Sequence, residues 1–336
     1  MEANVVERAF EGGERVPLVV QPRGRATVEA LAELVAGYRH ELRERLAWRG
    51  AVLFRGFSVD DPDRLARVVH AFTDAPSLRY VGGDTPRTRL REGVYTSTEA
   101  PAGVPIPLHS EMSYLPRHPR HLFFACASEP SRGGESTLAD TRAVLAGIEP
   151  AVRDLFLERG VRYIQVMRGK SLAFDLLEHV AAASKSWMQV FETDRRDEVE
   201  AACDELGLEH RWLPTGHLET SVVLPAMIRH SVTAEPIWFN QAHLFNFSPR
   251  WMGVLYYAGA LALHPRRATR THRATYGDGS DIENATLMHI LDVLEANTVV
   301  CRWQRGDLLI LDNETTMHGR TTFAGPRKIL VSLTGD

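Results

Sequence analysis

The chain has 336 residues, of which 44% are hydrophobic and 24% are charged, and its formal net charge is -4 at pH 7. This composition is typical of a soluble globular protein, and the mixed charges exclude a basic surface for nucleic acid or anionic membrane. With no run of about 18 apolar residues and no signal-peptide pattern, we expect a cytoplasmic protein with a small-molecule or protein partner. Its widely spaced Cys126, Cys203 and Cys301 are expected to be buried, reduced thiols.

The first part of the chain alternates helices with short strands. Apolar residues recur at helical spacing over 27–48, an apolar run at 51–57 predicts a buried strand, and acidic residues begin a helix at 62–72. Residues 80–99 are rich in Gly, Pro, Thr and Arg, which predicts a loop broken by a strand at 93–98. Further strands are expected at 107–114 and 121–127, and a third leads from a Gly-Gly turn to a helix N-cap at Asp140.

The rest of the chain mixes both kinds of element. Residues 152–217 are interpreted as a mixed insertion or lid, followed by extended segments at 221–228 and 236–240, helices at 249–263 and 282–296, and a polar loop at 266–280 between them. Strands are expected at 298–303, 308–311 and 328–333. Strands at both ends with helices between them predict a single domain, 1–336, of mainly β with α elements, whose two halves share a sheet system.

His109 and Glu111 lie in the predicted strand PLHSEMSY. Because side chains two apart on a strand share a face, this imidazole and this carboxylate are expected to converge on one point. His318 offers a third ligand if the two halves share a sheet. Two histidines and one carboxylate that leave open positions are the arrangement of non-haem Fe(II) oxygenases. His-x-Glu is also a common tripeptide, so the hypothesis depends on the other segments.

Arg327 follows His318 in the last predicted strand region. Its guanidinium can bind a carboxylate in bidentate fashion, and the Thr137 hydroxyl could add a hydrogen bond to the same carboxylate. From local context alone, Arg327 could equally be a surface arginine after a turn.

Six segments in order resemble the taurine dioxygenase-like family of Fe(II)- and 2-oxoglutarate-dependent oxygenases. They are RGAVLFRGF (49–57), PLHSEMSY (107–114), GGEST (133–137), WFNQ (238–241), GDLLILDN (306–313) and HGRTTFAGPR (318–327). The Glu in place of the commoner Asp and the HGR…GPR ending look most like the branch that contains clavaminate synthase and the syringomycin-pathway amino-acid hydroxylase.

The resemblance implies a double-stranded β-helix, or jelly roll, flanked by helices. It implies that His109, Glu111 and His318 hold Fe(II), that Arg327 and Thr137 hold the distal carboxylate of 2-oxoglutarate, and that O2 is the oxidant. Glu111 fills the position that a halogenase of this chemistry leaves vacant for chloride. The absence of His-Glu-x-x-His also disfavours a zinc hydrolase.

The substrate is less well defined. Relatives that bind small anionic substrates carry a second arginine four residues beyond the cosubstrate arginine, and here that position is Val331. This favours an aminoacyl group tethered to a carrier protein, or a larger substrate whose acid group is held elsewhere. Other candidates are Glu99 for a substrate ammonium and Gln241, with Arg320 placed to support His318. His243 is interpreted as a structural histidine.

The leading hypothesis is hydroxylation of an unactivated C–H bond of an amino acid or amino-acid-derived substrate in specialised metabolism. Desaturation or cyclisation by the same oxidative chemistry is the alternative, because the outcome depends on substrate geometry. A non-catalytic jelly-roll binding module remains a third interpretation.

Overall fold

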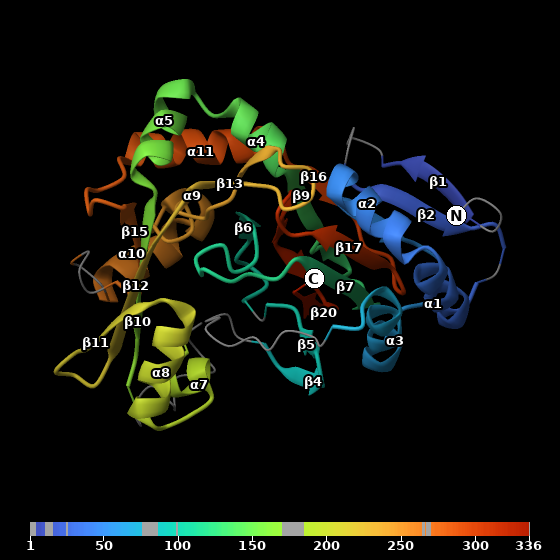
Figure 1. Cartoon of the computed structure of the whole chain (residues 1–336), viewed down its shortest axis with the longest axis horizontal. Helices are drawn as coiled ribbons and strands as arrows, with labels where there is room; N and C mark the ends of the chain where they lie inside the picture. The colour runs from blue at the N-terminus through green and yellow to red at the C-terminus, as the bar shows by residue number, and fades with distance from the viewer. Residues whose placement is uncertain are drawn as a thin grey trace.

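The structure is a computed structural model that describes residues 5–10, 16–24, 26–75, 87–98, 100–169, 185–263, 266 and 270–335. A large mixed sheet and a smaller sheet form the centre of the molecule (Figure 1). The large sheet contains, in spatial order, β1 (Val5–Ala9), β2 (Leu18–Pro22), β3 (Ala51–Phe54), β17 (Leu308–Asp312), β7 (His121–Ser128), β20 (Lys328–Thr334), β5 (Val94–Thr96) and β4 (Arg89–Arg91). The smaller sheet contains β16 (Val299–Cys301), β9 (Ser136–Asp140), β18 (Thr316–Arg320) and β6 (Ile106–His109).

Strand β17 lies between β3 and β7, so a C-terminal segment fills the middle of a sheet that begins with N-terminal strands. Its apolar run is buried on both faces, as expected for a central strand. Leu308 and Ile310 pack in an outer core with helices α1 (Val28–Gly37), α2 (Arg39–Arg49) and α3 (Pro62–Phe72), whereas Leu309 and Leu311 pack in the inner core beside the smaller sheet. The shared sheet system predicted from the strand pattern is therefore confirmed.

A third sheet has the order β11 (Glu209–Trp212), β12 (Leu218–Leu224), β10 (Val161–Met167) and β15 (His272–Tyr276). Two short pairs, β13 (Met227–Arg229) with β14 (Pro236–Trp238) and β8 (Arg132–Gly133) with β19 (Phe323–Ala324), complete the strands of the described residues. The remaining helices there are α4 (Thr141–Gly147), α5 (Pro150–Arg159), α7 (Trp187–Phe191), α8 (Arg196–Leu206), α9 (Pro249–Met252), α10 (Val254–Leu263) and α11 (Asn284–Ala296). None of the described helices combines the length and apolar character needed to cross a membrane.

Several predicted boundaries are wrong for physical reasons. The helix predicted at 27–48 is two helices that meet at Tyr38, and the one predicted at 249–263 is broken at Gly253, whose φ is 77°. Part of the polar loop predicted at 266–280 is strand β15, at the edge of its sheet, where polar side chains reach solvent. Residues 152–217, proposed as an insertion or lid, include β10 and β11, which share their sheet with β12 and β15 from outside that range; the role as a lid stays a prediction.

Candidate metal centre

The structure brings His109, Glu111 and His318 together, with one potential ligand atom from each lying within 4.8 Å of the others. His109 and His318 are cross-strand partners on β6 and β18, and their ring centroids are 4.4 Å apart. His318 Nε2 lies 3.6 Å from Glu111 Oε2. The two imidazoles and the carboxylate therefore lie close together, although Glu111 does not share a strand with His109.

His109 has the protonation state that a metal ligand requires. Its Nδ1 lies 2.9 Å from the Pro107 carbonyl oxygen, which leaves Nε2 as the nitrogen directed to the other two side chains. Burial and the neighbouring His318 lower the pKa of His109 to about 3, so its ring is neutral near pH 7 and keeps a lone pair. The donor set of two nitrogens and one carboxylate thus fits a divalent iron ion.

Glu111 reaches the same point from an unexpected conformation. Strand β6 ends at His109, and Glu111 lies in the turn that follows, immediately before Met112 with a φ of 56°. Arg87 Nη2 donates to Glu111 Oε2 over 2.7 Å, and both side chains are almost fully buried. Burial alone would raise the pKa of Glu111, but Arg87 and His318 outweigh it and hold that pKa below its usual range. The carboxylate is thus ionised, with Arg87 as its partner in this structure.

A small cleft lies over the two histidines. Arg327 lines it, and its Nε donates to the Gly134 carbonyl oxygen over 2.9 Å while Nη1 lies 3.4 Å from Ser97 Oγ. Burial and the nearby Arg320 lower the pKa of Arg327 to about 10, which still leaves it charged at neutral pH. The cleft therefore offers a cationic group beside the candidate metal position.

The expectation that Thr137 faces this cleft is wrong. In the pairing of β9 with β18, Leu138 is opposite His318 and Ser136 is opposite Arg320, so these four side chains share one face. Thr137 is opposite Gly319 and projects from the other face, where its hydroxyl would lie 2.6 Å from a Cβ built on that glycine. Ser136 is the hydroxyl-bearing residue of β9 that lines the cleft.

The other predicted substrate residues are placed as follows. Arg320 lines the cleft, and its guanidinium donates to the backbone oxygens of Ala100, Pro101 and Val104. These hydrogen bonds hold the segment before β6 in place. Gln241 is buried, and its backbone N–H donates to the Tyr163 hydroxyl. Val331 is fully buried in the core on the same strand as Ile329, which lines the cleft. Glu99 lies outside the described residues.

His243 has the structural role expected of it. Its Nε2 lies 2.8 Å from the Leu108 carbonyl oxygen, so it holds the strand that carries His109. Burial lowers its pKa to about 4.

Two further residues near the site, Arg87 and Asn313, were not predicted. Arg87 comes from a Thr- and Arg-rich stretch without periodicity, and Asn313, within the GDLLILDN segment, hydrogen-bonds the backbone of Glu111.

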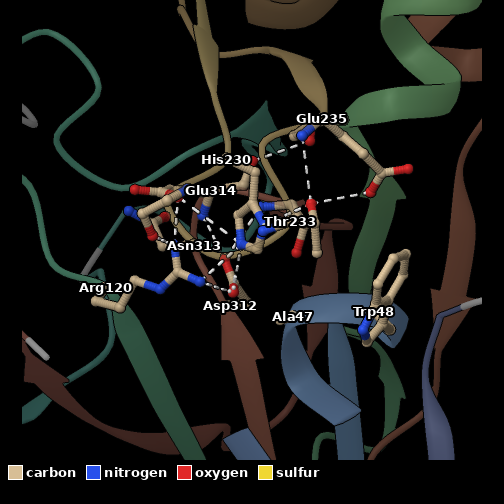
Figure 2. Close-up of polar contacts among 12 residues, drawn as sticks. Ala47, Trp48, Arg120, His230, Thr233, Glu235, Asp312, Asn313 and Glu314 are labelled. Atoms are coloured by element: carbon tan, nitrogen blue, oxygen red, sulfur yellow. Dashed lines mark hydrogen bonds and ion pairs between the residues drawn. The ribbon is translucent and has the colours of Figure 1, made fainter. Parts of the chain in front are cut away.

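A second group with metal-binding side chains lies at the end of β17. His230, Asp312 and Glu314 also place one potential ligand atom each within 4.8 Å of the others. Arg120 occupies their centre (Figure 2): Nη2 lies 2.6 Å from both Asp312 Oδ2 and His230 Nε2, and Nη1 pairs with Glu314. The guanidinium supplies the positive charge that this group needs, so we assign no metal to it.

The sequence matches the family described as "Taurine catabolism dioxygenase TauD, TfdA family" over residues 16–334. It is 32% identical to the dapdiamide synthesis protein DdaC of Enterobacter agglomerans, across 98% of this chain and 93% of that protein. It is 29% identical to a clavaminate synthase-like protein of Arabidopsis thaliana, across 99% and 98%.

Among solved structures, PvcB of Pseudomonas aeruginosa superposes with a TM-score of 0.53 at 20% identity, across 98% of this chain and 90% of that one. At this identity the superposition supports the fold alone. The family match covers nearly the whole chain, and the structure places two histidines on the cleft with the Glu111 carboxylate close to His318. The protein therefore belongs to the TauD/TfdA family and is a jelly-roll dioxygenase dependent on non-haem Fe(II), 2-oxoglutarate and O2.

Proposed function

We propose that this enzyme hydroxylates an unactivated C–H bond of an amino acid or amino-acid-derived substrate in specialised metabolism. The observation that carries the proposal is the convergence of His109, Glu111 and His318 below a cleft that also holds Arg327. Bound iron supplies oxygen activation, with 2-oxoglutarate as the reductant: one oxygen atom of O2 enters succinate and the other enters the product, with release of CO2.

The residues of the chain have distinct tasks in this proposal. His109, Glu111 and His318 hold the iron and leave open positions, while Arg327 binds the distal carboxylate of 2-oxoglutarate. The Ser136 hydroxyl, on the cleft face of β9, replaces Thr137 in the predicted set. Phe124, which also lines the cleft and whose ring centroid lies 5.1 Å from that of His318, gives the cleft an apolar wall beside that histidine.

The substrate class rests on the cleft and on the relatives. The position four residues beyond Arg327 is the buried, apolar Val331, which cannot bind a substrate acid group. Arg87 lines the cleft on the side of Glu111 and provides a cation for such a group at a different place. One relative is named for dapdiamide synthesis, another is clavaminate synthase-like, and PvcB is described as part of an isonitrile synthetic pathway. These names favour a biosynthetic substrate, either free or tethered to a carrier protein.

The first test is an anaerobic titration of the apoprotein with Fe(II) and 2-oxoglutarate, which follows the weak visible charge-transfer band of the chelate. We expect the band in the wild type and a requirement for far more 2-oxoglutarate in Arg327→Ala. If no band forms and no iron is retained, the proposed chemistry is wrong for this chain.

The second test screens free and carrier-bound amino acids by mass spectrometry. Gain of one oxygen atom supports hydroxylation, whereas loss of two hydrogen atoms supports the alternative of desaturation or cyclisation. Comparable activity on a free amino acid and on its tethered form would contradict the carrier-dependent version.

A further inference from the structure

Glu111 has no strand neighbour to hold its backbone. It lies beyond the end of β6 in a turn whose next residue, Met112, has a φ of 56°, a conformation that non-glycine residues adopt only when their surroundings hold it. A metal ligand must nevertheless be held to within a fraction of an ångström, because coordination geometry depends on it. Another part of the molecule therefore has to fix this turn.

The Asn313 side chain makes the contacts that a neighbouring strand would make. Asn313 Oδ1 accepts the backbone N–H of Glu111 over 2.7 Å, and Nδ2 donates to the backbone oxygen of Glu111 over 2.9 Å. The same Nδ2 donates to the Pro119 carbonyl oxygen over 2.8 Å, near the other end of the loop. A carboxamide both donates and accepts, as a peptide group does, so it can satisfy both backbone groups of one residue.

Asn313 is itself held firmly. It is fully buried, and its backbone N–H donates to the Arg120 carbonyl oxygen over 2.9 Å. The preceding Asp312 accepts the backbone N–H groups of Glu314 and Thr315 at Oδ1, and it pairs with Arg120 at Oδ2. Figure 2 shows these residues around the end of β17, with His230 reaching them from the β13–β14 connection. The connection that leads directly into β18 and His318 is therefore rigid.

We infer that Asn313 is a positioning residue for the iron site: it fixes the backbone of Glu111 relative to the connection that leads to His318. This inference rests on the proposed role of Glu111 as a ligand. Without the carboxamide the fold keeps its two main sheets, but Glu111 loses the contacts that set its distance from the two histidines.

The test measures metal affinity in the apoprotein, with no turnover involved. Anaerobic Co(II) titration, followed by the visible ligand-field bands, compares the wild type, Asn313→Ala and the matched control Asn240→Ala. Asn240 is also buried, and its carboxamide also donates to one backbone oxygen, that of Ala226, and accepts one backbone N–H, that of Ala242. Both variants lose the same kind of hydrogen bonds, so thermal unfolding of the apoproteins measures the purely structural loss.

We expect the Co(II) dissociation constant of Asn313→Ala to rise by about tenfold to a hundredfold, whereas that of Asn240→Ala stays within about threefold of wild type. The band pattern of Asn313→Ala should also change, because the carboxylate is displaced. A folded Asn313→Ala protein with wild-type affinity and bands would overturn the inference. A wild type that binds no Co(II) would instead contradict the proposed function, so the two failures are distinguishable.

A second measurement does not depend on any variant. Hydrogen exchange of the wild-type apoprotein should show the Glu111 amide protected to the same degree as the amides of β18, although Glu111 lies outside a strand. Rapid exchange at Glu111 would mean that the carboxamide does not hold it in solution, and the inference would fail.

Discussion

Two groups of histidine and carboxylate side chains in this protein have nearly the same composition but differ in their contacts with arginine. His109, Glu111 and His318 converge beside a cleft, and the Arg87 guanidinium there pairs with Glu111 only. His230, Asp312 and Glu314 converge equally closely, but Arg120 fills the space between them. A set of metal-binding side chains thus does not by itself make a metal site. The difference is in how many members of each group a buried arginine contacts: Arg87 pairs with Glu111 alone, whereas Arg120 contacts both carboxylates and the histidine of the second group.

The largest expected difference between the two groups is in metal binding. His318→Ala should abolish retention of Fe(II) at stoichiometric concentration and reduce succinate formation by about a thousandfold or more, since an open site has no spare protein ligand. His230→Ala should retain one metal ion per chain. Metal analysis after desalting, together with a succinate assay, checks both. Equal metal loss in the two variants would mean that the second group also binds the ion.

The next largest difference is in stability. Arg120→Met should lower the free energy of unfolding by about 3 to 5 kcal/mol, because it leaves the Asp312 and Glu314 carboxylates buried without their cation. Arg195→Met is the control: its ion pair with Asp197 is exposed and screened by solvent, so its loss should leave the free energy of unfolding nearly unchanged. Denaturant titration of the apoproteins measures both values. A stability loss in Arg120→Met no greater than that of the control would contradict the paired state of the second group.

Arg327 and Arg320 both line the cleft, but we expect their substitution to change different properties: cosubstrate binding for Arg327 and stability for Arg320. Arg327→Gln should raise the KM for 2-oxoglutarate by about a hundredfold, which corresponds to losing charged hydrogen bonds to a carboxylate. Arg320→Gln should mainly lower thermal stability, because Arg320 donates to three backbone oxygens. Initial rates at varied 2-oxoglutarate and thermal melts distinguish the two. The assignment of Arg327 is wrong if both variants change the KM equally.

The smallest effect is a pH dependence of the apoprotein. His109 and His243 have folded pKa values of about 3 and about 4, below the unfolded value near 6.5, so only the unfolded chain takes up their protons between those limits. Stability should therefore fall as the pH decreases from about 6.5, by at most about 1.4 kcal/mol per pH unit for each histidine. His243→Gln should make the slope between pH 6 and 4.5 shallower. An unchanged slope would show that His243 is not buried in its neutral form.

The proposed ligand set came from the positions of His109, Glu111 and His318 in strand-like segments, and the structure brings these side chains together although Glu111 lies in a turn. The error at Thr137 has a simple cause: a shift of one residue in a strand moves a side chain to the opposite face, and only the register with β18 decides it. Strand β15 was interpreted as loop because an edge strand tolerates polar residues. Arg87 and Asn313 act through contacts with Glu111 that no local pattern records, so only the structure could find them.

Glu111 and Asn313 are 202 residues apart in the sequence, and β17, which ends just before Asn313, occupies the middle of the large sheet. The proposed site therefore cannot form until the strands that follow Asn313 have been synthesised. A nascent or truncated polypeptide that lacks the C-terminal strands lacks His318, Arg327 and the strand that joins the two halves. Such a fragment cannot bring the proposed ligands together, so the proposed site forms only after the C-terminal strands have been synthesised.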